Sequence, residues 1–343
     1  MNPTQQAPVT PERIMQFAWG YIPTLVLEAA ITHHVFDTLD SGPKTIQQVH
    51  EATNASVRGL DAIMNALVGL NFLAKTGNNG DALYSLTPES STFLVSTKPS
   101  FHGGVLRHTS RQLMPNFLHL NEVVATGKPV RAVNQEADGT EFFHKFVVDI
   151  LPMSYPSAKA LAHHLNLGAT QQPTSALDLA AGSGVWGIAL AQSAPTVHVT
   201  AVDWPNVLPT TKEVVARFGL TSQFSFSPGD LDGADFGTGH NVATLGHILH
   251  SEGVERSKAL LAKVFAALAP GGTIAIAEFL VNAGRTGPPN GLLFAVNMLV
   301  NTDDGGTYSF EEISTWLREA GFENPRTLDA PGPSPLILAT KPS

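Results

Sequence analysis

The sequence contains no cysteine among its 343 residues. This excludes disulfide bonds, thiolate catalysis and cysteine-ligated zinc. Basic residues are also few, because 20 Lys and Arg stand against 29 Asp and Glu, for a net charge of −9. Such a charge disfavours non-specific binding of nucleic acid or of an anionic membrane. We therefore expect a small, neutral or apolar partner, and no nucleic acid.

The sequence also lacks the patterns of export and of membrane insertion. Residues 1–15 are polar and proline-bearing, without the cationic and apolar regions of a signal peptide. Residues 291–300 are among the longest apolar stretches and are too short to span a bilayer. These features predict a cytoplasmic protein with no membrane contact.

The length allows about two domains, and the pattern changes along the chain. Residues 11 to about 165 are mostly helical in periodicity, and Thr45 and Ser56 are candidate N-caps of two short helices. Two predicted strands then flank the turn 76–81. Two helices followed by a two-stranded wing are typical of a winged helix.

A winged helix raises the possibility of a DNA-binding regulator with a ligand-sensing domain. Its second helix, within residues 56–70, carries Arg58 opposed by Asp61 and has no lysine. Phosphate contacts dominate the affinity for DNA, so this helix is poorly equipped to bind it. The pattern favours a packing surface, and DNA recognition is the alternative.

From about residue 175, apolar strands alternate with amphipathic helices. This alternation predicts an α/β domain with a Rossmann-like, doubly wound parallel sheet. The predicted strands are 175–180, 197–202, 223–228, 241–246, 272–278 and a last one within 333–342, and the predicted helices are 185–194, 206–219, 254–269 and 309–321.

A glycine-rich turn follows the first of these strands. Gly182, Gly184 and Gly187 form G-x-G-x-x-G, and Asp203 lies about twenty residues later, as in a dinucleotide site. An NAD-dependent oxidoreductase is therefore one interpretation. A pyrophosphate is anionic, however, whereas S-adenosylmethionine carries a cationic ammonium and sulfonium. Asp178, just before the turn, suits the cationic cofactor better, unless it only caps backbone groups.

The surrounding segments resemble the class I S-adenosylmethionine-dependent methyltransferases. More narrowly, they resemble the small-molecule O-methyltransferase family, which includes plant caffeate and flavonoid enzymes, acetylserotonin methyltransferase and bacterial natural-product enzymes. The resemblance covers nearly the whole chain and rests on five motifs in order: LDLAAGSGVWGIALAQ, VTAVDWPNVL, FSPGDLDGADFG, VATLGHILHSEG and LAPGGTIAIAEFLV.

The resemblance implies a homodimer that binds S-adenosyl-L-methionine, without a metal. Residues 1–110 would be the winged-helix dimerisation domain, 111–165 linking helices that contribute to the substrate pocket, and 166–343 the cofactor-binding domain. Gly182 and Gly184 would let the backbone approach the methionine moiety. Asp203 would bind the ribose hydroxyls, with Trp204 against the adenine and Asp230 and Leu231 at the adenine edge. Asp178 completes the expected cofactor-binding set.

The resemblance also implies catalytic residues. His250 occupies the position of the family's general base, and Glu278 that of the acid that orients it. Histidine suits this role because a phenol is mostly protonated at neutral pH. The sequence departs from the family pattern after the histidine, where Ser251 and Glu252 replace Asp and Trp, and at Thr307, where a second acid is expected. Methyl transfer by proximity alone, or C- or N-methylation, are therefore the alternatives.

We expect the methyl acceptor between the two halves of the chain, where apolar residues favour a flat, aromatic molecule. His247 is a competing candidate for the base. With His250 it lacks obvious further ligands for a metal. Individual apolar members of the expected pocket are equally compatible with plain core. The expected acceptor residues are Phe142, Phe143, Phe146, Met153, His247, Phe294, Asn297 and Met298.

Overall fold

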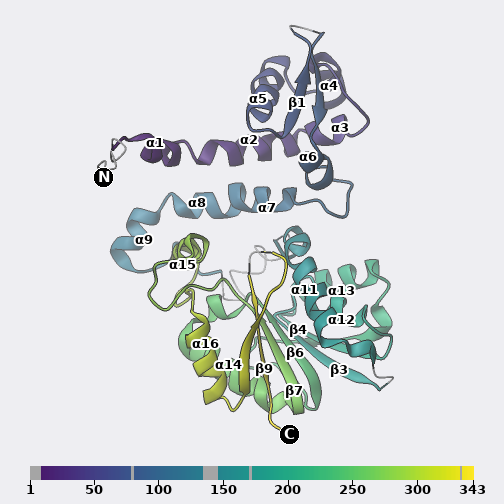
Figure 1. Ribbon diagram of the computed structural model, residues 1–343, viewed down its shortest axis with the longest axis vertical. Coiled ribbons are helices and arrows are strands. Elements are labelled where there is room, and N and C mark those ends of the chain that lie inside the picture. Colours follow the sequence, from purple (N-terminus) through teal and green to yellow (C-terminus); the bar gives the residue numbers. More distant parts are fainter. Residues whose placement is uncertain (1–8, 79–80, 134–145, 170–171, 333) are drawn as a thin grey trace, which may run out of the picture. The chain divides into compact units, whose positions relative to one another are not determined.

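The computed structural model describes residues 9–78, 81–133, 146–169, 172–332 and 334–343. The chain divides into two compact units, Met1–Arg111 and Gln112–Ser343. The first is mainly helical, and the second contains a large twisted sheet between helices (Figure 1).

The N-terminal unit combines short helices with one antiparallel hairpin. The Thr45 side chain forms a capping box with Gln48, and the Ser56 side chain accepts a hydrogen bond from the backbone N–H of Gly59. Both predicted N-caps are thus confirmed, and so is the hairpin. The elements are α1 (Glu12–Ala18), α2 (Tyr21–Thr32), α3 (Val35–Leu39), α4 (Ile46–Thr53), α5 (Val57–Gly69), β1 (Leu73–Thr76), β2 (Leu83–Leu86), α6 (Pro88–Phe93) and α7 (Gly103–His108).

Large apolar side chains on and between α1 and α2 are exposed within one chain. Ile14, Phe17 and Trp19 are 72%, 74% and 63% exposed. By length and composition alone, the stretch Glu12–Thr32 is also apolar enough to cross a membrane, with a hydropathy of 1.3. Helices that pack against another protein chain meet the same criterion, so this property does not by itself indicate a membrane. The exposed side chains form an apolar surface on this part of the N-terminal unit.

The C-terminal unit is built on a seven-stranded sheet in the order β5-β4-β3-β6-β7-β9-β8. The first five strands in this order are parallel. At one edge, β9 pairs antiparallel with β7, and β8 pairs antiparallel with β9. The strands are β3 (Thr174–Leu179), β4 (Val197–Asp203), β5 (Phe224–Pro228), β6 (His240–Gly246), β7 (Leu268–Ala277), β8 (Glu323–Leu328) and β9 (Leu336–Thr340).

Helices cover both faces of this sheet (Figure 1). Alternate side chains of β3 point to opposite faces: Ala176 packs in the cluster that includes α11 and α12, and Leu177 in the cluster that includes α14 and α16. The predicted doubly wound α/β fold is confirmed. The helices of the unit are α8 (Met114–Phe117), α9 (Leu120–Thr126), α11 (Leu151–Leu165), α12 (Val185–Ala191), α13 (Leu208–Arg217), α14 (Leu249–Ala267), α15 (Pro289–Asn301) and α16 (Phe310–Glu319).

Two local differences from the predicted elements stand out. Strand β8 was not expected; its side chains are half-buried or exposed, so it lacks the apolar run of the central strands. Gly253 has a non-helical backbone (φ 74°, ψ 174°) that divides α14 into a short first turn from Leu249 and a main helix. The main helix starts after Gly253, where the predicted helix starts, and the short turn before Gly253 was not expected. That early turn carries His250.

Candidate active site

The glycine turn between β3 and α12 uses its three glycines differently. Gly182 and Gly184 have left-handed backbones, with φ of 54° and 76°. A Cβ on Gly182 would lie 3.2 Å from Cγ1 of Val147. At Gly187 a Cβ would lie 2.7 Å from Cγ1 of Val199, so this glycine allows α12 to pack closely on the sheet. The first two glycines therefore shape the turn, and the third serves packing.

Asp178 lies beneath this turn and is fully buried. Its Oδ2 accepts a hydrogen bond from the backbone N–H of Gly187 at 2.9 Å, and its Oδ1 accepts one from the Thr244 hydroxyl at 2.8 Å. Burial raises the pKa of Asp178 to about 7 in spite of these bonds. Both oxygens of Asp178 thus accept hydrogen bonds from protein groups. This favours the alternative interpretation from the sequence, in which Asp178 is a carboxyl at a strand end that caps backbone groups.

Asp203 ends β4, next to the turn. Its carboxylate accepts hydrogen bonds from the backbone N–H groups of Gly182 and Trp204, each at 2.7 Å. Burial raises the pKa of Asp203 to about 6, against the effect of these two donors. The carboxylate of Asp203 is therefore bound to the glycine turn. It lies at the carboxyl end of β4, at the edge of the sheet where ligands of this fold bind.

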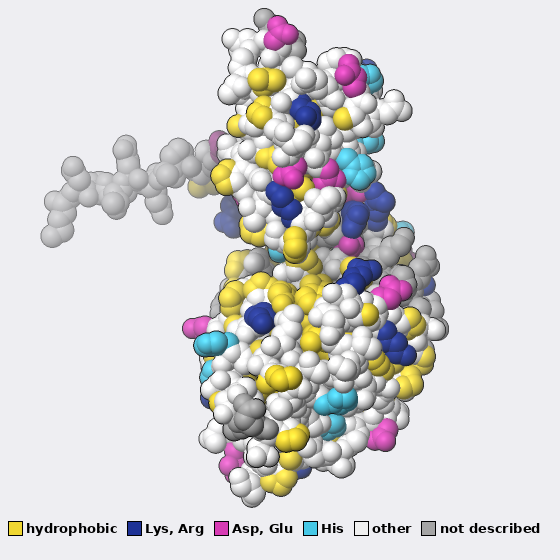
Figure 2. Space-filling view, turned by 90° about the vertical axis from the view of Figure 1, so that its right-hand side faces the viewer, with side chains coloured by type: hydrophobic (Ala, Val, Ile, Leu, Met, Phe, Trp, Pro, Cys, Tyr) yellow, Lys and Arg dark blue, Asp and Glu magenta, His cyan; other side chains and the backbone are white. Residues whose placement is uncertain are grey.

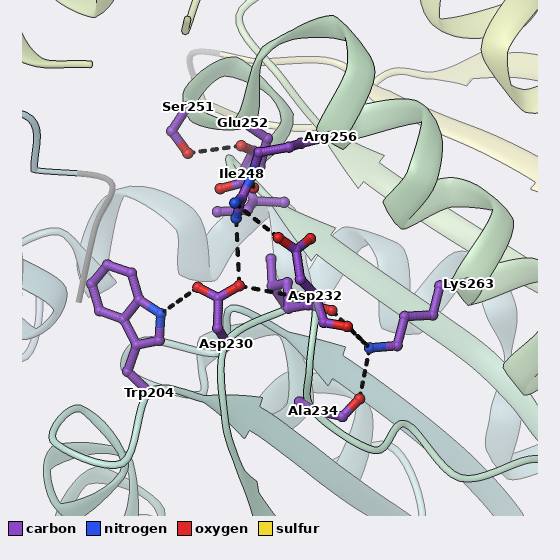
Figure 3. A network of polar contacts seen from close by, with 10 residues as sticks. Trp204, Asp230, Asp232, Ala234, Ile248, Ser251, Glu252, Arg256 and Lys263 are labelled. Carbon is purple, nitrogen blue, oxygen red and sulfur yellow. Dashed lines mark hydrogen bonds and ion pairs between the residues drawn. The ribbon is translucent and has the colours of Figure 1, made fainter. Parts of the chain in front are cut away.

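Asp230 follows β5 and lies at the centre of a polar network (Figure 3). Its Oδ2 accepts a hydrogen bond from Nε1 of Trp204 at 3.0 Å, and its Oδ1 lies 3.4 Å from Nη2 of Arg256. Partial burial opposes ionisation, but the hydrogen bonds from Asp232 and Trp204 and the charge of Arg256 hold the pKa of Asp230 below its usual value. Leu231, by contrast, is 8% exposed and packs into the core.

His250 and Glu278 form the most buried ion-pair contact among the described residues, with side chains 12% and 3% exposed. Nδ1 of His250 lies 2.8 Å from Oε2 of Glu278, and the backbone N–H of His250 donates to Oε1 at 3.2 Å. Burial disfavours the charge of Glu278, yet His250 and His247 lower the pKa of this carboxyl. An ionised Glu278 is an acceptor only, so Nδ1 carries the proton.

His247 lies close to this pair but in a different environment. Its backbone is left-handed (φ 63°), its N–H donates to Ala277 O at 2.9 Å, and its Nε2 lies 3.0 Å from Oγ of Ser334. Burial lowers the pKa of His247 to about 4, although Glu278 opposes the shift. His247 is therefore neutral at physiological pH and is bonded to Ser334.

Two phenylalanines accompany the histidines. The ring centroids of Phe279 and Phe294 are 4.1 Å apart, Phe294 meets His250 edge-on at 4.9 Å, and Phe279 lies 5.1 Å from His247. Phe279 was missed in the sequence because it simply follows Glu278. Its position beside His247 comes from the pairing of β6 with β7, which aligns Gly246 with Ala277.

The other expected acceptor residues are more scattered. Phe142 and Phe143 lie outside the described residues, and Phe146 and Met153 are half-buried. Met298 is 5% exposed and belongs to the core. The side chain and backbone oxygens of Asn297 accept hydrogen bonds from Nδ2 of Asn301, in the next turn of α15.

The two departures from the family pattern next to His250 are also visible. The Ser251 hydroxyl donates to Ile248 O at 2.9 Å. Thr307 is 3% exposed, and its Oγ1 has no hydrogen-bond partner among the described residues. Within those residues, no group of three or more His, Asp or Glu side chains is arranged to hold a metal ion.

Two protein families match the chain, in order. The O-methyltransferase dimerisation domain matches residues 15–96, and the O-methyltransferase domain matches residues 154–323. Among curated proteins, 3-hydroxy-5-methyl-1-naphthoate 3-O-methyltransferase of Streptomyces sahachiroi is 27% identical over 340 residues, covering 96% of this chain and 95% of the relative.

A second curated relative differs from the first in the atom that its name gives as methylated, and a solved structure is similar in fold. L-tyrosine C(3)-methyltransferase of Streptomyces lavendulae is 25% identical, covering 99% of this chain and 95% of the relative. The structure of human N-acetylserotonin methyltransferase in complex with S-adenosylmethionine matches with a TM-score of 0.84 at 24% identity, over 100% of both chains. The chain belongs to the S-adenosylmethionine-dependent O-methyltransferase family of small-molecule methyltransferases, with an N-terminal dimerisation domain.

Proposed function

We propose that this methyltransferase transfers a methyl group to a hydroxyl oxygen of a small aromatic molecule, with His250 as general base. The observation that carries the proposal is the buried pair of His250 and Glu278 at the carboxyl end of β6 and β7. The glycine turn follows the carboxyl end of β3, which pairs directly with β6. The methyl donor and the base would therefore meet at one edge of the sheet.

The residues around the turn fit S-adenosylmethionine. Gly182 leaves a space that a Cβ would narrow against Val147, and Asp203 and Asp230 present acidic oxygens at the ends of neighbouring strands. Carboxylates attract the cationic amino and sulfonium groups and accept hydrogen bonds from ribose hydroxyls and the adenine amino group. We assign Asp203 to the ribose and Trp204 and Asp230 to the adenine side. When bound, the cofactor supplies an electrophilic methyl group on a sulfonium.

Proton transfer would run through His250. Nδ1 is held by Glu278, so the neutral imidazole carries its lone pair on Nε2. Nε2 would take the proton of the acceptor hydroxyl, whose oxygen would receive the methyl group that the cofactor supplies. The ionised Glu278 stabilises the imidazolium that results. His247 is unsuited to this role, because burial keeps its pKa near 4.

The aromatic side chains support a planar acceptor. Phe279 and Phe294 flank the two histidines and provide ring faces and edges on which an aromatic ring packs. The relative from Streptomyces sahachiroi is named for a hydroxynaphthoate, which is a flat molecule of this kind.

Methylation of carbon is the second candidate. One relative is named an L-tyrosine C(3)-methyltransferase, and Thr307 stands where a second acid would support the base. Incubating the protein with labelled S-adenosylmethionine and a panel of phenols, then locating the methyl by mass spectrometry, separates the candidates. A methyl on oxygen supports the primary proposal. A methyl on a ring carbon or a nitrogen, with no ether formed, would overturn it.

We also propose that the protein is a homodimer. The family match assigns a dimerisation domain to residues 15–96, and the exposed Phe17 and Trp19 provide apolar surface that a second copy would bury. The cytoplasmic location and the absence of a nucleic-acid or membrane partner remain predictions from the sequence. On the face drawn in Figure 2, acidic, basic and apolar side chains of residues 112–343 are interspersed.

A further inference from the structure

Arg256 contacts two parts of the C-terminal unit, the first turn of α14 and the loop that follows β5 (Figure 3). Its Nε donates to Oε2 of Glu252 at 2.6 Å. Its Nη1 lies 2.9 Å from Oδ2 of Asp232, and its Nη2 lies 3.4 Å from Oδ1 of Asp230. One guanidinium thus contacts the turn that carries His250 and the loop that follows β5.

Lys263 of α14 holds the backbone of this loop, since its Nζ donates to the carbonyl oxygens of Leu231, Asp232 and Ala234. Arg256 differs from Lys263 in that it contacts the side chains of the loop and also the turn that carries His250.

Gly253 breaks the helical backbone directly after Glu252, so the turn with His250 is not continuous with the main part of α14. The ion pair of Glu252 with Arg256 bridges that break. On the other side, the indole N–H of Trp204 donates to Asp230, which connects the loop to Asp203 and the glycine turn.

The three ion pairs are not of equal weight. Asp232 and Asp230 are 59% and 39% exposed, and pairs at such positions contribute little to the free energy of unfolding, so we expect them to affect the orientation of the loop rather than the stability of the fold. Glu252 is only 7% exposed, and burial raises its pKa even with Arg256 beside it. Removing Arg256 would leave a buried carboxylate without its cation, which is strongly unfavourable. The pair with Glu252 therefore anchors the guanidinium, and the two aspartates are held by it.

We propose that Arg256 is a positioning residue, which fixes the loop of Asp230 and Asp232 against the turn that carries His250. In this role it raises the affinity for the cofactor and keeps the base in its orientation. The effect on turnover rests on the proposed function of His250, whereas the effect on cofactor affinity rests only on the adenine-side position of Asp230.

The test compares Arg256→Met with the wild-type protein in calorimetric titrations with S-adenosylhomocysteine, which need no methyl acceptor. We expect the dissociation constant to rise about tenfold, equivalent to about 1.4 kcal/mol. Arg256→Lys should restore part of the affinity, because an ammonium keeps the charge but loses the planar fork. Arg217→Met is the matched control, since Arg217 pairs with Glu213 at 3.8 Å on the surface of another helix. Its affinity should stay unchanged.

A double variant separates positioning from stability. In Glu252→Gln with Arg256→Met, no buried carboxylate is left unpaired, so the melting temperature should recover toward the wild type. The affinity for S-adenosylhomocysteine should stay low, because Asp230 and Asp232 still lack their ion pairs with Arg256. Wild-type affinity in the folded double variant would overturn the proposal.

Turnover provides the second measurement, with an acceptor found in the phenol panel. Arg256→Met should lower kcat as well as cofactor affinity. If His250 is not the base, His250→Gln stays active while the loss of affinity in Arg256→Met persists. That combination rejects the proposed function and retains the positioning role in cofactor binding. Unchanged affinity in a folded Arg256→Met rejects the positioning role itself.

Discussion

His250 and Glu278 are joined by two hydrogen bonds, because the imidazole Nδ1 and the backbone N–H of the same histidine reach the two oxygens of one carboxylate. The carboxylate therefore fixes the position of the backbone as well as the direction of the ring. A histidine held in this way presents Nε2 in a defined direction, which is what a general base requires.

The first prediction concerns the base itself. His250→Gln should lower kcat by about a hundred- to ten-thousand-fold, the usual contribution of general base catalysis. The affinity for S-adenosylhomocysteine, measured by titration calorimetry, should not change. A loss of only a few-fold, together with an equally mild His247→Gln, would indicate transfer by proximity alone.

The second prediction concerns the carboxylate. Glu278→Gln should lose less activity than His250→Gln, because the imidazole stays in place and the amide oxygen can still accept from Nδ1. The amide NH2 would face the backbone N–H of His250, so some loss is expected. Steady-state kinetics of the two variants at one pH decide the order. A larger loss in Glu278→Gln than in His250→Gln would contradict the assigned roles.

The third prediction concerns Gly187, the glycine that allows α12 to pack closely on the sheet. Gly187→Ala should destabilise the C-terminal unit by about 1–3 kcal/mol, because its Cβ would overlap Val199 at 2.7 Å and crowd Asp178 at 3.0 Å. Gly69→Ala is the control: its Cβ meets nothing within 4 Å, at the end of α5. Urea denaturation measures both. Equal stability in the two variants would mean that α12 does not pack on the sheet as closely as described.

The fourth prediction tests the dimer. Phe17→Asp combined with Trp19→Asp should give a monomer by light scattering, since these side chains are 74% and 63% exposed and contribute little to the fold of one chain. The circular dichroism spectrum should stay unchanged. Val124→Asp, at a 66% exposed position of α9, is the control and should leave the mass unchanged. A wild-type protein that is monomeric at micromolar concentration would refute the dimer.

Much of the fold follows from local patterns in the sequence. The central strands are apolar runs bounded by turn residues, and the capping residues Thr45 and Ser56 mark helix starts, so these elements were predictable. Strand β8 was not, because an edge strand buries little and its residues carry no apolar alternation. Its formation depends on the antiparallel partner β9, which no local pattern reveals.

In the site, too, some residues are predictable from local motifs, and others come together only through the fold. His250 and Glu278 were predicted through motifs that follow strands of the sheet, and the structure brings the two side chains into contact, while their catalytic roles stay predictions. The contacts of Asp178 could not be foreseen, because they join it to Gly187 and to Thr244 on a neighbouring strand. Arg256 was missed for a similar reason: in sequence it is one charge on an amphipathic helix, and only the fold brings it to the loop after β5.

The last prediction concerns the pH dependence of stability that follows from the lowered pKa of His247. Its pKa is lowered to about 4 in the folded protein, against about 6.5 in an unfolded chain. Between these values His247 binds more protons in the unfolded chain, so its contribution to the free energy of unfolding falls as the pH falls from 6.5 to 4. The contribution reaches at most about 3 kcal/mol, because each pKa unit is worth 1.36 kcal/mol. Asp178, whose pKa is raised to about 7, acts in the opposite direction.

His247→Gln isolates this contribution, because Asp178 is common to both proteins and cancels in the difference. Glutamine can keep a hydrogen bond to Ser334 but does not titrate. Urea denaturation of both proteins at pH 4, 5, 6 and 7 should show that the free energy of unfolding of the variant rises relative to that of the wild type as the pH falls. For the control His164→Gln, at an exposed position of α11, the free energy of unfolding should change with pH as it does in the wild type. Parallel curves for wild type and His247→Gln would mean that His247 is accessible to protons in the folded state, and would reopen its candidacy as the catalytic base.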